Sequence, residues 1–418
     1  MTRAPRLIAV VLAGALAMAD ERPAGGAEAA PARLALVGGK VVTIERGTLD
    51  GAAVLVAGGK VEAVLSGPGP AYEPPEGYET IDARGRWVLP GFVDLHSHVG
   101  GTDINDMVYP VNPGFRVLDN IRPNNPLLQR AVAGGVTTIL FIPGSGTNMS
   151  GFGALMKTAG DTLDECLVRF PGALKIAQGG NPERGGGDLG RDRMGMNWLI
   201  RNALQEGKRY AEAWSDYEAG RRTEAPERNP RLEYFRGLFR GEYPVLVHTQ
   251  GYQLVSSTIR ILKDEMGLKV VIGHGEFDAY LLAPEVARRG VPVIVGPRQL
   301  RFDSQRGAID GLAASWRKGG VVEVGVNTDS GVVPEEELVY QATMAVRLGL
   351  EPEAALRALT IVPARAAGIE ARIGSIEAGK DADLVIWTGD PLDVRSHVLQ
   401  TIVNGKLVYD TRREPRRF

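Results

Sequence analysis

The chain has 418 residues, of which 44% are hydrophobic, which is enough for a large catalytic domain, a smaller second domain and a sizeable buried core. Its 48 Lys and Arg residues stand against 50 Asp and Glu residues, so the formal charge is only −2. Composition therefore provides no general attraction to nucleic acid or to an anionic membrane surface. We expect a small-molecule substrate and no nucleic-acid partner, and a homo-oligomer remains open.

The N-terminus is predicted to be a targeting segment. Arg3 and Arg6 precede an apolar run from Leu7 to Met18, and Ala17-Met18-Ala19 offers small residues at the spacing that signal peptidase accepts. A buried helix or a membrane anchor is the alternative, but the run is too short to span a bilayer. We expect residues 1–19 to be a signal peptide, and the mature protein to be periplasmic or secreted, without membrane association after cleavage.

The single cysteine, Cys166, cannot form an internal disulfide. It lies in a helical pattern from Thr162 to Phe170, which favours a buried, inert thiol over a nucleophile. We therefore expect the fold to be stabilised by core burial and by metal.

Both ends of the chain are predicted to be rich in β-strands. Residues 33–86 contain short β-branched runs broken by glycines, and the same pattern returns in residues 370–412. In the second stretch, Val403-Asn404-Gly405-Lys406 is typical of a tight hairpin turn. We predict one small composite β-sandwich domain formed by both termini.

The middle of the chain, residues 87–369, alternates apolar strand-like runs with helical stretches, which is typical of buried parallel strands. With a less certain strand near 152–156, the count reaches eight, and we predict an α/β fold, a (β/α)8 TIM barrel. The other seven expected strands span 87–94, 136–142, 173–177, 244–248, 269–273, 292–296 and 321–327.

The stretch from Gly179 to Tyr243 is longer than a barrel crossover requires, and its second half is predicted to be helical from Met196 to Ala219. A solvated excursion that covers the barrel is the favoured interpretation, and a substrate lid is the alternative.

Four of the five histidines follow predicted strands. His96 and His98 come directly off the first barrel strand, where residues two apart point to the same side. His248 and His274 each lie at the carboxyl end of an apolar run, where TIM-barrel enzymes assemble their sites. Because imidazole is the commonest neutral ligand for zinc and its neighbours, the four histidines predict a metal site.

Asp329 ends the last predicted strand, in Val324-Gly325-Val326-Asn327-Thr328-Asp329. A helix cap or turn is the ordinary role of such an aspartate. Beside four histidines, we expect it to bind metal and to move the proton of the attacking water to the leaving group.

Lys175 is the one charged residue in the short apolar run from Ala173 to Ala177, where a cation is costly unless it is neutralised. Carbamylation by carbon dioxide would convert it to an anionic bridge between two metals. The alternative is a lysine whose stem packs while its amine reaches solvent or a carboxylate. Lys157 is the weaker candidate for the bridging role.

Three residues are candidates for substrate binding. Arg184 and Arg298 follow the fourth and seventh strands and could meet a substrate carboxylate bidentately, although surface salt bridging is the ordinary role of each. Tyr252 follows His248 closely and could line the pocket. His397 belongs to the terminal β-domain and is not expected to be a ligand.

The order His-x-His, lysine, His, His, Asp on successive strand ends resembles the amidohydrolase superfamily, in particular its exported imidazolonepropionase-like and dipeptidase-like members. The resemblance covers most of residues 33–410, including Val88-Leu89-Pro90-Gly91-Phe92-Val93-Asp94 and Gly379-Lys380-Asp381-Ala382-Asp383-Leu384-Val385. The sequence departs from the pattern of its nearest relatives at Gly180, where an acidic residue commonly precedes Asn-Pro.

The resemblance implies a barrel with a composite β-sandwich, one or two divalent metals, zinc being favoured, and hydrolysis of a carbon–nitrogen bond by metal-activated water. It implies that His96, His98 and Asp329 bind the more buried metal, that Lys175 bridges as a carbamate, and that His248 and His274 bind the second metal. Without the carbamate, a single metal on His96, His98, His248 and Asp329 is implied.

Amides, cyclic amides and dipeptides all suit this site. An aminohydrolase on a ring amidine or a lactonase is the enzymatic alternative, because the same metal centre serves these reactions. No glutamate suited to ring deamination is evident directly after His248, where Thr249-Gln250-Gly251 follows. A non-catalytic ligand-binding barrel is the remote alternative.

Overall fold

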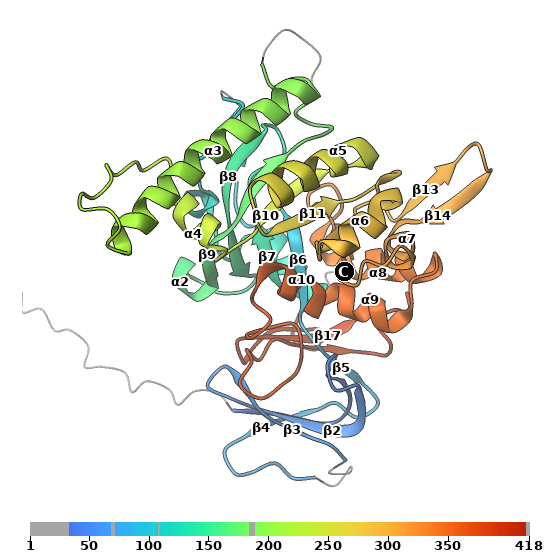
Figure 1. Ribbon diagram of the computed structural model, residues 1–418. Helices are drawn as coiled ribbons and strands as arrows, with labels where there is room; N and C mark the ends of the chain where they lie inside the picture. The colour runs from blue at the N-terminus through green and yellow to red at the C-terminus, as the bar shows by residue number, and fades with distance from the viewer. Residues whose placement is uncertain (1–32, 68–71, 103, 108, 184–188, 415–418) are drawn as a thin grey trace, which may run out of the picture. The chain divides into compact units, whose positions relative to one another are not determined.

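The structure is a computed structural model that describes residues 33–67, 72–102, 104–107, 109–183 and 189–414 (Figure 1). The predicted signal peptide, residues 1–19, lies outside these residues. The described residues fall into one unit that contains two large sheets, so the division into separate domains stays a prediction. Within these ranges no helix is both long and apolar enough to cross a membrane.

The terminal sheet combines strands from both ends of the chain, as the sequence predicts. Its order is β18-β17-β16-β5-β1-β2-β3, with β4 paired to β1. The Asn404-Gly405 turn between β17 and β18 has φ values of 48° and 74°, as the expected hairpin requires. The strands are β1 (Leu34–Val42), β2 (Thr48–Ala57), β3 (Lys60–Leu65), β4 (Glu79–Asp82), β5 (Trp87–Pro90), β16 (Leu384–Trp387), β17 (Val398–Val403) and β18 (Lys406–Asp410).

The stretch 87–94, expected to be one barrel strand, is split between the two sheets. β5 pairs with β1 and β16 in the terminal sheet, and the barrel begins only at β6, Phe92–Ser97. The break falls at Gly91, where a Cβ atom would lie 2.0 Å from Thr137 Oγ1. Only glycine allows the chain to pass this close to the neighbouring strand.

The barrel sheet has eight strands in the order β15-β12-β11-β10-β9-β8-β7-β6. A bridge between Ser97 and Ser330 brings its two ends together, and the backbone N–H of His98 donates to the Ser330 carbonyl at 2.7 Å. The strands after β6 are β7 (Val136–Phe141), β8 (Met149–Lys157), β9 (Leu167–Ala177), β10 (Val245–Thr249), β11 (Val270–His274), β12 (Val293–Val295) and β15 (Val324–Val326).

The uncertain third strand exists, but it does not run as the expected eight repeated βα units require. β8 is antiparallel to both β7 and β9. The connection 142–148 is too short for a helical crossover, and parallel neighbours need about a dozen or more connecting residues. The start of β8 therefore lies at the rim where β7 and β9 end.

The reversal of β8 corrects the proposal for Lys157. This residue ends β8 and consequently lies at the opposite edge of the barrel from the strand ends that carry histidine. Its Nζ atom is 3.0 Å from Asp381 Oδ2 and also contacts Asp383, both in the segment that leads into β16. Lys157 thus joins the barrel to the terminal sheet and takes no part in the metal site.

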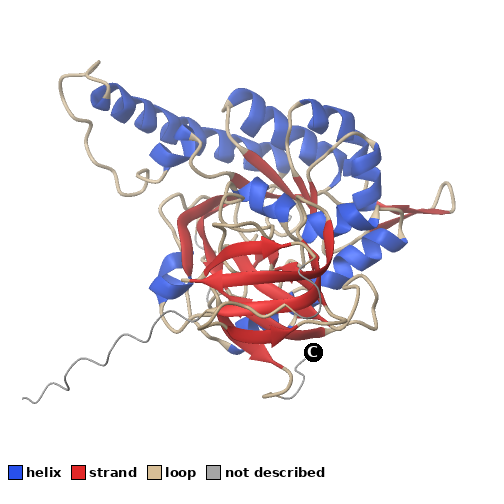
Figure 2. Ribbon diagram, turned by 90° about the horizontal axis from the view of Figure 1, so that it is seen from below, coloured by secondary structure: helices blue, strands red, loops and turns tan. Residues whose placement is uncertain are grey.

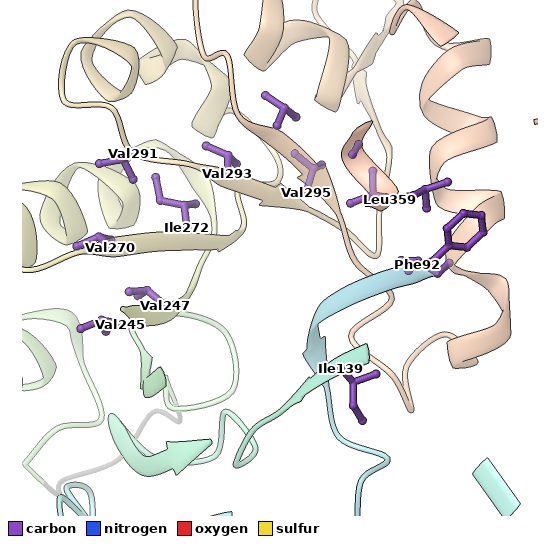
Figure 3. Packing of buried hydrophobic residues seen from close by; sticks show 14 of the residues in the cluster. Phe92, Ile139, Val245, Val247, Val270, Ile272, Val291, Val293, Val295 and Leu359 are labelled. Carbon is purple, nitrogen blue, oxygen red and sulfur yellow. The ribbon is translucent and has the colours of Figure 1, made fainter. Parts of the chain in front are cut away.

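Alternate residues of the barrel strands form the main core, which Figure 3 shows for β10, β11 and β12. Val245, Val247, Val270 and Ile272 pack toward the surrounding helices. The residues between them, such as Leu246 and Val271, belong to a second cluster. The two-residue period of a strand therefore directs one set of side chains to the helices and the other to the barrel interior.

Helices surround the barrel, whereas the terminal sheet is accompanied by loops (Figure 2). The predicted excursion contains the 26-residue helix α3, Arg193–Glu218, which confirms the expected helix within about three residues. Figure 1 shows the β13–β14 hairpin, Leu300–Asp303 and Ala308–Gly311, extending beside α7. The remaining helices are α1 (Pro126–Ala133), α2 (Leu163–Cys166), α4 (Phe235–Arg240), α5 (Gly251–Thr258), α6 (Ala283–Arg288), α7 (Leu312–Lys318), α8 (Leu338–Arg347), α9 (Pro352–Leu359) and α10 (Ile361–Ala367), with single-turn or π segments at Val117–Asn120, Ile259–Glu265, Ala279–Leu282 and Glu335–Glu337.

Cys166 is fully buried at the end of α2, and burial raises the pKa of its thiol to about 11. The helix is shorter than expected, because β9 begins at Leu167. The thiol remains protonated at neutral pH, in agreement with the inert role predicted for it.

Candidate metal centre

Six predicted side chains meet at the barrel rim, contributed by five strands of the barrel sheet or by the residues that follow them, and four of these strands, β6, β9, β10 and β11, are labelled in Figure 1. Their donor atoms form two overlapping groups that could hold metal ions, one made by three histidines and the other by two histidines and an aspartate. His96 belongs to both groups, and Lys175 Nζ lies 2.8 Å from His96 Nε2. The six residues are His96, His98, Lys175, His248, His274 and Asp329.

Strand register explains how residues far apart in sequence reach this point. Lys175 pairs with Leu246, so it lies two rows below His248 on the same face of the sheet. His274 pairs with Thr249 at the end of the next strand. The barrel closure then brings the β15 end, with Asp329, against the end of β6.

His274 and Asp329 have left-handed backbone conformations, with φ values of 73° and 47°. Such conformations cost about 1–3 kcal/mol for most residues and are concentrated at functional sites. Here they turn the side chains of two strand-terminal residues into the rim.

His98 and His274 are each held by a defined contact on one side of the ring. The Nδ1 atoms of His98 and His274 lie 2.9 and 2.6 Å from the carbonyl oxygens of Ile142 and Gly296, which leaves their Nε2 atoms facing the centre. Such outer contacts orient metal ligands and fix their tautomers. The Nε2 of His98 is 3.2 Å from Asp329 Oδ1, and the Nε2 of His96 is 3.3 Å from the same oxygen.

His248 presents its Nδ1 atom to the centre instead. This atom lies 2.7 Å from His274 Nε2 and 2.9 Å from Ser145 Oγ. Two ring nitrogens at this separation can share a proton, and a metal ion would bind both after a small increase in their separation. Ser145 was not predicted from the sequence, and its position shortly after β7 was the only available signal.

Electrostatics favour a cation at this point. Burial lowers the pKa of His274 to about 4 and holds the pKa values of His96 and His248 well below normal, with neighbouring positive groups adding to the effect. Burial alone would raise the pKa of Asp329, but the His98 hydrogen bond and nearby cationic groups lower it. Neutral imidazoles with an ionised carboxylate are the donors that a divalent metal requires, so the residues fit such an ion.

Lys175 is completely buried, and burial lowers the pKa of its amine to about 7. No carboxylate of the described residues forms an ion pair with it. The alternative in which the amine reaches solvent is therefore wrong for this lysine, and Asp329 interacts with the amine only at a longer range than an ion pair. A large share of the amine is uncharged near neutral pH, the form that can react with carbon dioxide.

A buried polar layer behind the site was largely missed at the sequence level. Asp94 Oδ1 accepts from the His96 backbone N–H at 2.8 Å, and Asp94 Oδ2 accepts from the Thr328 hydroxyl at 2.7 Å. Ser97 Oγ donates to Glu335 Oε2 at 2.6 Å. Burial raises the pKa of Asp94 to about 6 and that of Glu335 far above normal. The motif around His96 includes Asp94, but nothing in the sequence connects Glu335 with this place.

A second missed acid, Glu276, lies two residues after His274. It is 4% exposed, and burial raises its pKa to about 7. Its Oε1 accepts from the Arg298 backbone N–H at 2.9 Å, and its Oε2 accepts from Gln250 Nε2 at 3.2 Å. Glu276 therefore places a carboxyl group just after β11, beside the residues that follow His248.

The structure describes two of the three residues that were predicted to bind substrate. Arg298 is exposed, and its guanidinium lies over the Phe277 ring at 5.2 Å from the centroid. Tyr252 is 43% exposed at the start of α5. Arg184 lies outside the described residues, and substrate contact by any of the three stays a prediction. His397 belongs to neither group of potential metal ligands and lies just before β17, as expected.

A rim of histidines and an aspartate on a barrel is typical of metal-dependent hydrolases that activate water. The model of the amidohydrolase family matches residues 288–408. The amidohydrolase of Thermotoga maritima MSB8 has a solved structure that is 34% identical, with a TM-score of 0.79, and the alignment covers 90% of this chain and all of that one.

Two curated relatives also point to the amidohydrolase family. Amidohydrolase tasK of Hapsidospora irregularis is 28% identical over 82% of this chain, which spans only 38% of that longer protein. The imidazolonepropionase of Mesorhizobium japonicum is 26% identical, over 82% of this chain and 87% of that protein. The chain belongs to the amidohydrolase family and is a hydrolase acting on carbon–nitrogen bonds, which confirms the resemblance found in the sequence.

Proposed function

We propose that this chain hydrolyses a linear amide bond, in a dipeptide or an N-acyl amino acid, at a two-zinc centre bridged by carbamylated Lys175. The observation that carries the proposal is Lys175 itself, which is buried without a described carboxylate partner and lies 2.8 Å from His96 Nε2. A carbamate would remove the unpaired cation and place an anion between the two groups of ligands. His96, His98 and Asp329 would hold one ion, and His248 with His274 the other.

The chemistry that the ions supply when bound is polarisation of the substrate carbonyl and a lower pKa for water. The residues of the chain supply proton transfer. Asp329 is ionised, so it can accept a proton from the attacking water and pass it to the leaving nitrogen. Hydroxyl is added to the carbonyl carbon, the C–N bond breaks, and the nitrogen leaves as an amine.

The polar layer behind the site supports this role of Asp329. Asp94 accepts a hydrogen bond from the Thr328 backbone at 2.9 Å, as well as from its hydroxyl. Because Asp94 also holds the His96 backbone, it fixes the ends of β6 and β15 relative to each other. The proton acceptor and the histidines are therefore positioned before substrate arrives.

Glu276 favours a second candidate, hydrolysis of a ring amidine. The sequence places no glutamate directly after His248, but Glu276 reaches the same region through its hydrogen bond with Gln250. Its raised pKa makes it able to donate a proton to a ring nitrogen near neutral pH.

One assay separates the two candidates. Protein produced with zinc and bicarbonate is given N-acyl amino acids, dipeptides, a cyclic amide and a ring amidine, each with a chelator-treated sample as control. Turnover of linear amides that is lost on chelation supports the first proposal. Turnover of the ring amidine alone, abolished in Glu276→Gln, would replace the first proposal with the second.

We also propose that the protein is exported, on the strength of the apolar run 7–18 and the small residues after it. Mass spectrometry of the cell-derived protein would show a mature N-terminus near Asp20. A cell-derived protein that still begins at Met1 would contradict export through this segment.

A further inference from the structure

Ser145 places a buried hydroxyl directly beside the metal centre. The residue is 5% exposed and lies shortly after β7. Among the described residues, its Oγ atom has one hydrogen-bond contact, with His248 Nδ1 at 2.9 Å. A hydroxyl in this place can brace the histidine, attack the substrate as a nucleophile or donate a hydrogen bond to the substrate. The surrounding contacts distinguish these three roles.

The atom that Ser145 contacts is also a potential metal ligand. His248 Nδ1 lies 2.7 Å from His274 Nε2, and both residues belong to one group of possible ligands. When the two nitrogens hold an ion, the His248 lone pair is no longer free to accept a hydrogen from Ser145. A buried donor that loses its acceptor is costly, so a substrate oxygen at the centre is the acceptor that the hydroxyl then requires.

Two backbone hydrogen bonds hold the segment that carries Ser145. The N–H of Ile142 donates to the Ser97 carbonyl oxygen at 3.1 Å, and the N–H of Gly144 donates to the Ile104 carbonyl oxygen at 3.0 Å. Both acceptors lie in β6 or in the loop that follows it. The hydroxyl is therefore positioned before a substrate arrives, and a donor fixed in advance stabilises developing charge most effectively.

The contacts do not suit a nucleophilic serine. Such a serine passes its proton to a histidine whose ring is free to accept it. Here the acceptor atom, His248 Nδ1, is shared with His274 and serves as a ligand in the proposed centre. The hydroxyl of Ser145 is therefore suited to donate a hydrogen bond while it keeps its proton.

The two groups of potential ligands separate Ser145 from Asp329. Asp329 Oδ1 lies 3.3 and 3.2 Å from the Nε2 atoms of His96 and His98, in one group. Ser145 contacts His248, in the other group. Because Asp329 accepts the proton of the attacking water in the proposed reaction, the water belongs to the first side. The carbonyl oxygen of the amide then belongs to the side of Ser145.

We propose that the Ser145 hydroxyl is a catalytic hydrogen-bond donor to the carbonyl oxygen of the scissile amide. Negative charge develops on this oxygen as hydroxyl adds to the carbonyl carbon, so the hydrogen bond strengthens toward the transition state. The carbonyl re-forms when the C–N bond breaks, and the serine keeps its proton throughout. The inference rests on the proposed amide hydrolysis and adds a catalytic residue to it.

The variant Ser145→Ala, studied as the zinc-loaded full chain, tests this role. We expect kcat for N-acetyl-L-phenylalanine to fall about 10²-fold and KM to stay within about two-fold, because the hydrogen bond is strongest in the transition state. The control is Ser150→Ala, which removes a nearby buried hydroxyl that contacts Thr147 instead and should keep the wild-type kcat. An unchanged kcat in Ser145→Ala overturns the proposal.

Binding of a tetrahedral analogue gives a readout that does not depend on turnover. In N-(methylphosphonyl)-L-phenylalanine a charged phosphonyl oxygen replaces the carbonyl oxygen. By calorimetry, Ser145→Ala is expected to bind this analogue at least about ten-fold more weakly than the wild type, with unchanged affinity for the product L-phenylalanine. Equal weakening of both ligands would indicate a general loss of the site and overturns the proposal.

Metal content distinguishes a donor to substrate from a brace for His248. Elemental analysis should find the same zinc content in Ser145→Ala, Ser150→Ala and the wild type, because Ser145 is not itself a proposed ligand. Loss of zinc in Ser145→Ala alone would show that the serine positions His248, which overturns the proposal. Covalent labelling of wild-type Ser145 by a fluorophosphonate would identify a nucleophile and overturns it as well.

The analogue also separates this inference from the proposed function. Binding that depends on Ser145, without hydrolysis of any linear amide, would refute the proposed function and leave the hydrogen bond standing. Hydrolysis, with analogue binding that is absent or independent of Ser145, would leave the function standing and refute the role of the serine. Neither hydrolysis nor binding would refute both.

Discussion

Burial and neighbouring groups together set the charges of the titratable side chains at the centre. Burial lowers the pKa values of His96, His248, His274 and Lys175, whereas Asp329 stays ionised because positive groups and a hydrogen bond outweigh its own burial. The local sequence could identify these residue types as ligands. It could not predict their charge states, which depend on neighbours from five strands.

Asp329→Asn should separate proton transfer from folding. The amide has the same shape but cannot accept the proton of water, so kcat for amide hydrolysis is expected to fall by about 10²–10⁴-fold. Steady-state kinetics with zinc in excess would measure this. The surface variant Asp264→Asn, which loses only an exposed partner of Arg289, is the control. A kcat in Asp329→Asn equal to that of the control would mean that another group carries the proton.

At the scale of elements, the reversed strand β8 distinguishes the structure from the regular barrel that was predicted. Its short connection to β7 forces antiparallel pairing and moves Lys157 to the barrel edge that faces the terminal sheet. Lys157 and Lys175 both lie in apolar surroundings, and the sequence could rank them but not assign their roles. The direction of one strand decides which lysine reaches the metal centre and which one joins the two sheets.

Lys157→Met should destabilise the protein strongly. The change leaves Asp381 and Asp383 buried without this cation, and breaking a buried pair in this way costs about 3–5 kcal/mol. Urea denaturation would measure the loss of unfolding free energy. Lys60→Met removes a half-exposed partner of the same Asp381 and is expected to cost less than about 1 kcal/mol. Similar losses in the two variants would be inconsistent with a buried ionic link between the sheets.

Acid should weaken the same link. Burial alone would raise the pKa of Asp381, but the charge of Lys157 and the hydrogen bonds from Lys60 and Lys157 lower it to about 2. Because the folded pKa lies below the usual value, the stabilisation is complete above about pH 4 and is lost as the pH falls through about 2. Linkage gives a contribution of about 2 kcal/mol. The stability difference between wild type and Asp381→Asn, measured from pH 5 to 2, should shrink over this window, and a constant difference would exclude the shift.

At the scale of the whole molecule, strand-terminal histidines and paired β-rich ends were sufficient to predict the barrel, the terminal sheet and the cluster of side chains that could hold a metal. These features can be recognised in short stretches of sequence, because each depends on a local pattern of residue types. Glu335 and Glu276 could not be found in this way. Each is brought to the rim by loop conformation or strand order, and each becomes notable only through its burial and its neighbours.

The family comparison and the site agree at this scale. The amidohydrolase relatives establish hydrolysis of carbon–nitrogen bonds, while the buried Lys175 leads to the narrower proposal of a carbamate bridge.

The most direct test of the account is the metal content of protein produced with zinc and ¹³C-bicarbonate, measured by elemental analysis beside Lys175→Ala and the exposed control Lys318→Ala. We predict nearly two zinc ions per chain and a ¹³C carbamate signal in the wild type and the control. In Lys175→Ala we expect one ion or none and no such signal. A single ion in all three proteins, without a carbamate signal, would contradict the bridged pair and assign the chemistry to a mononuclear site.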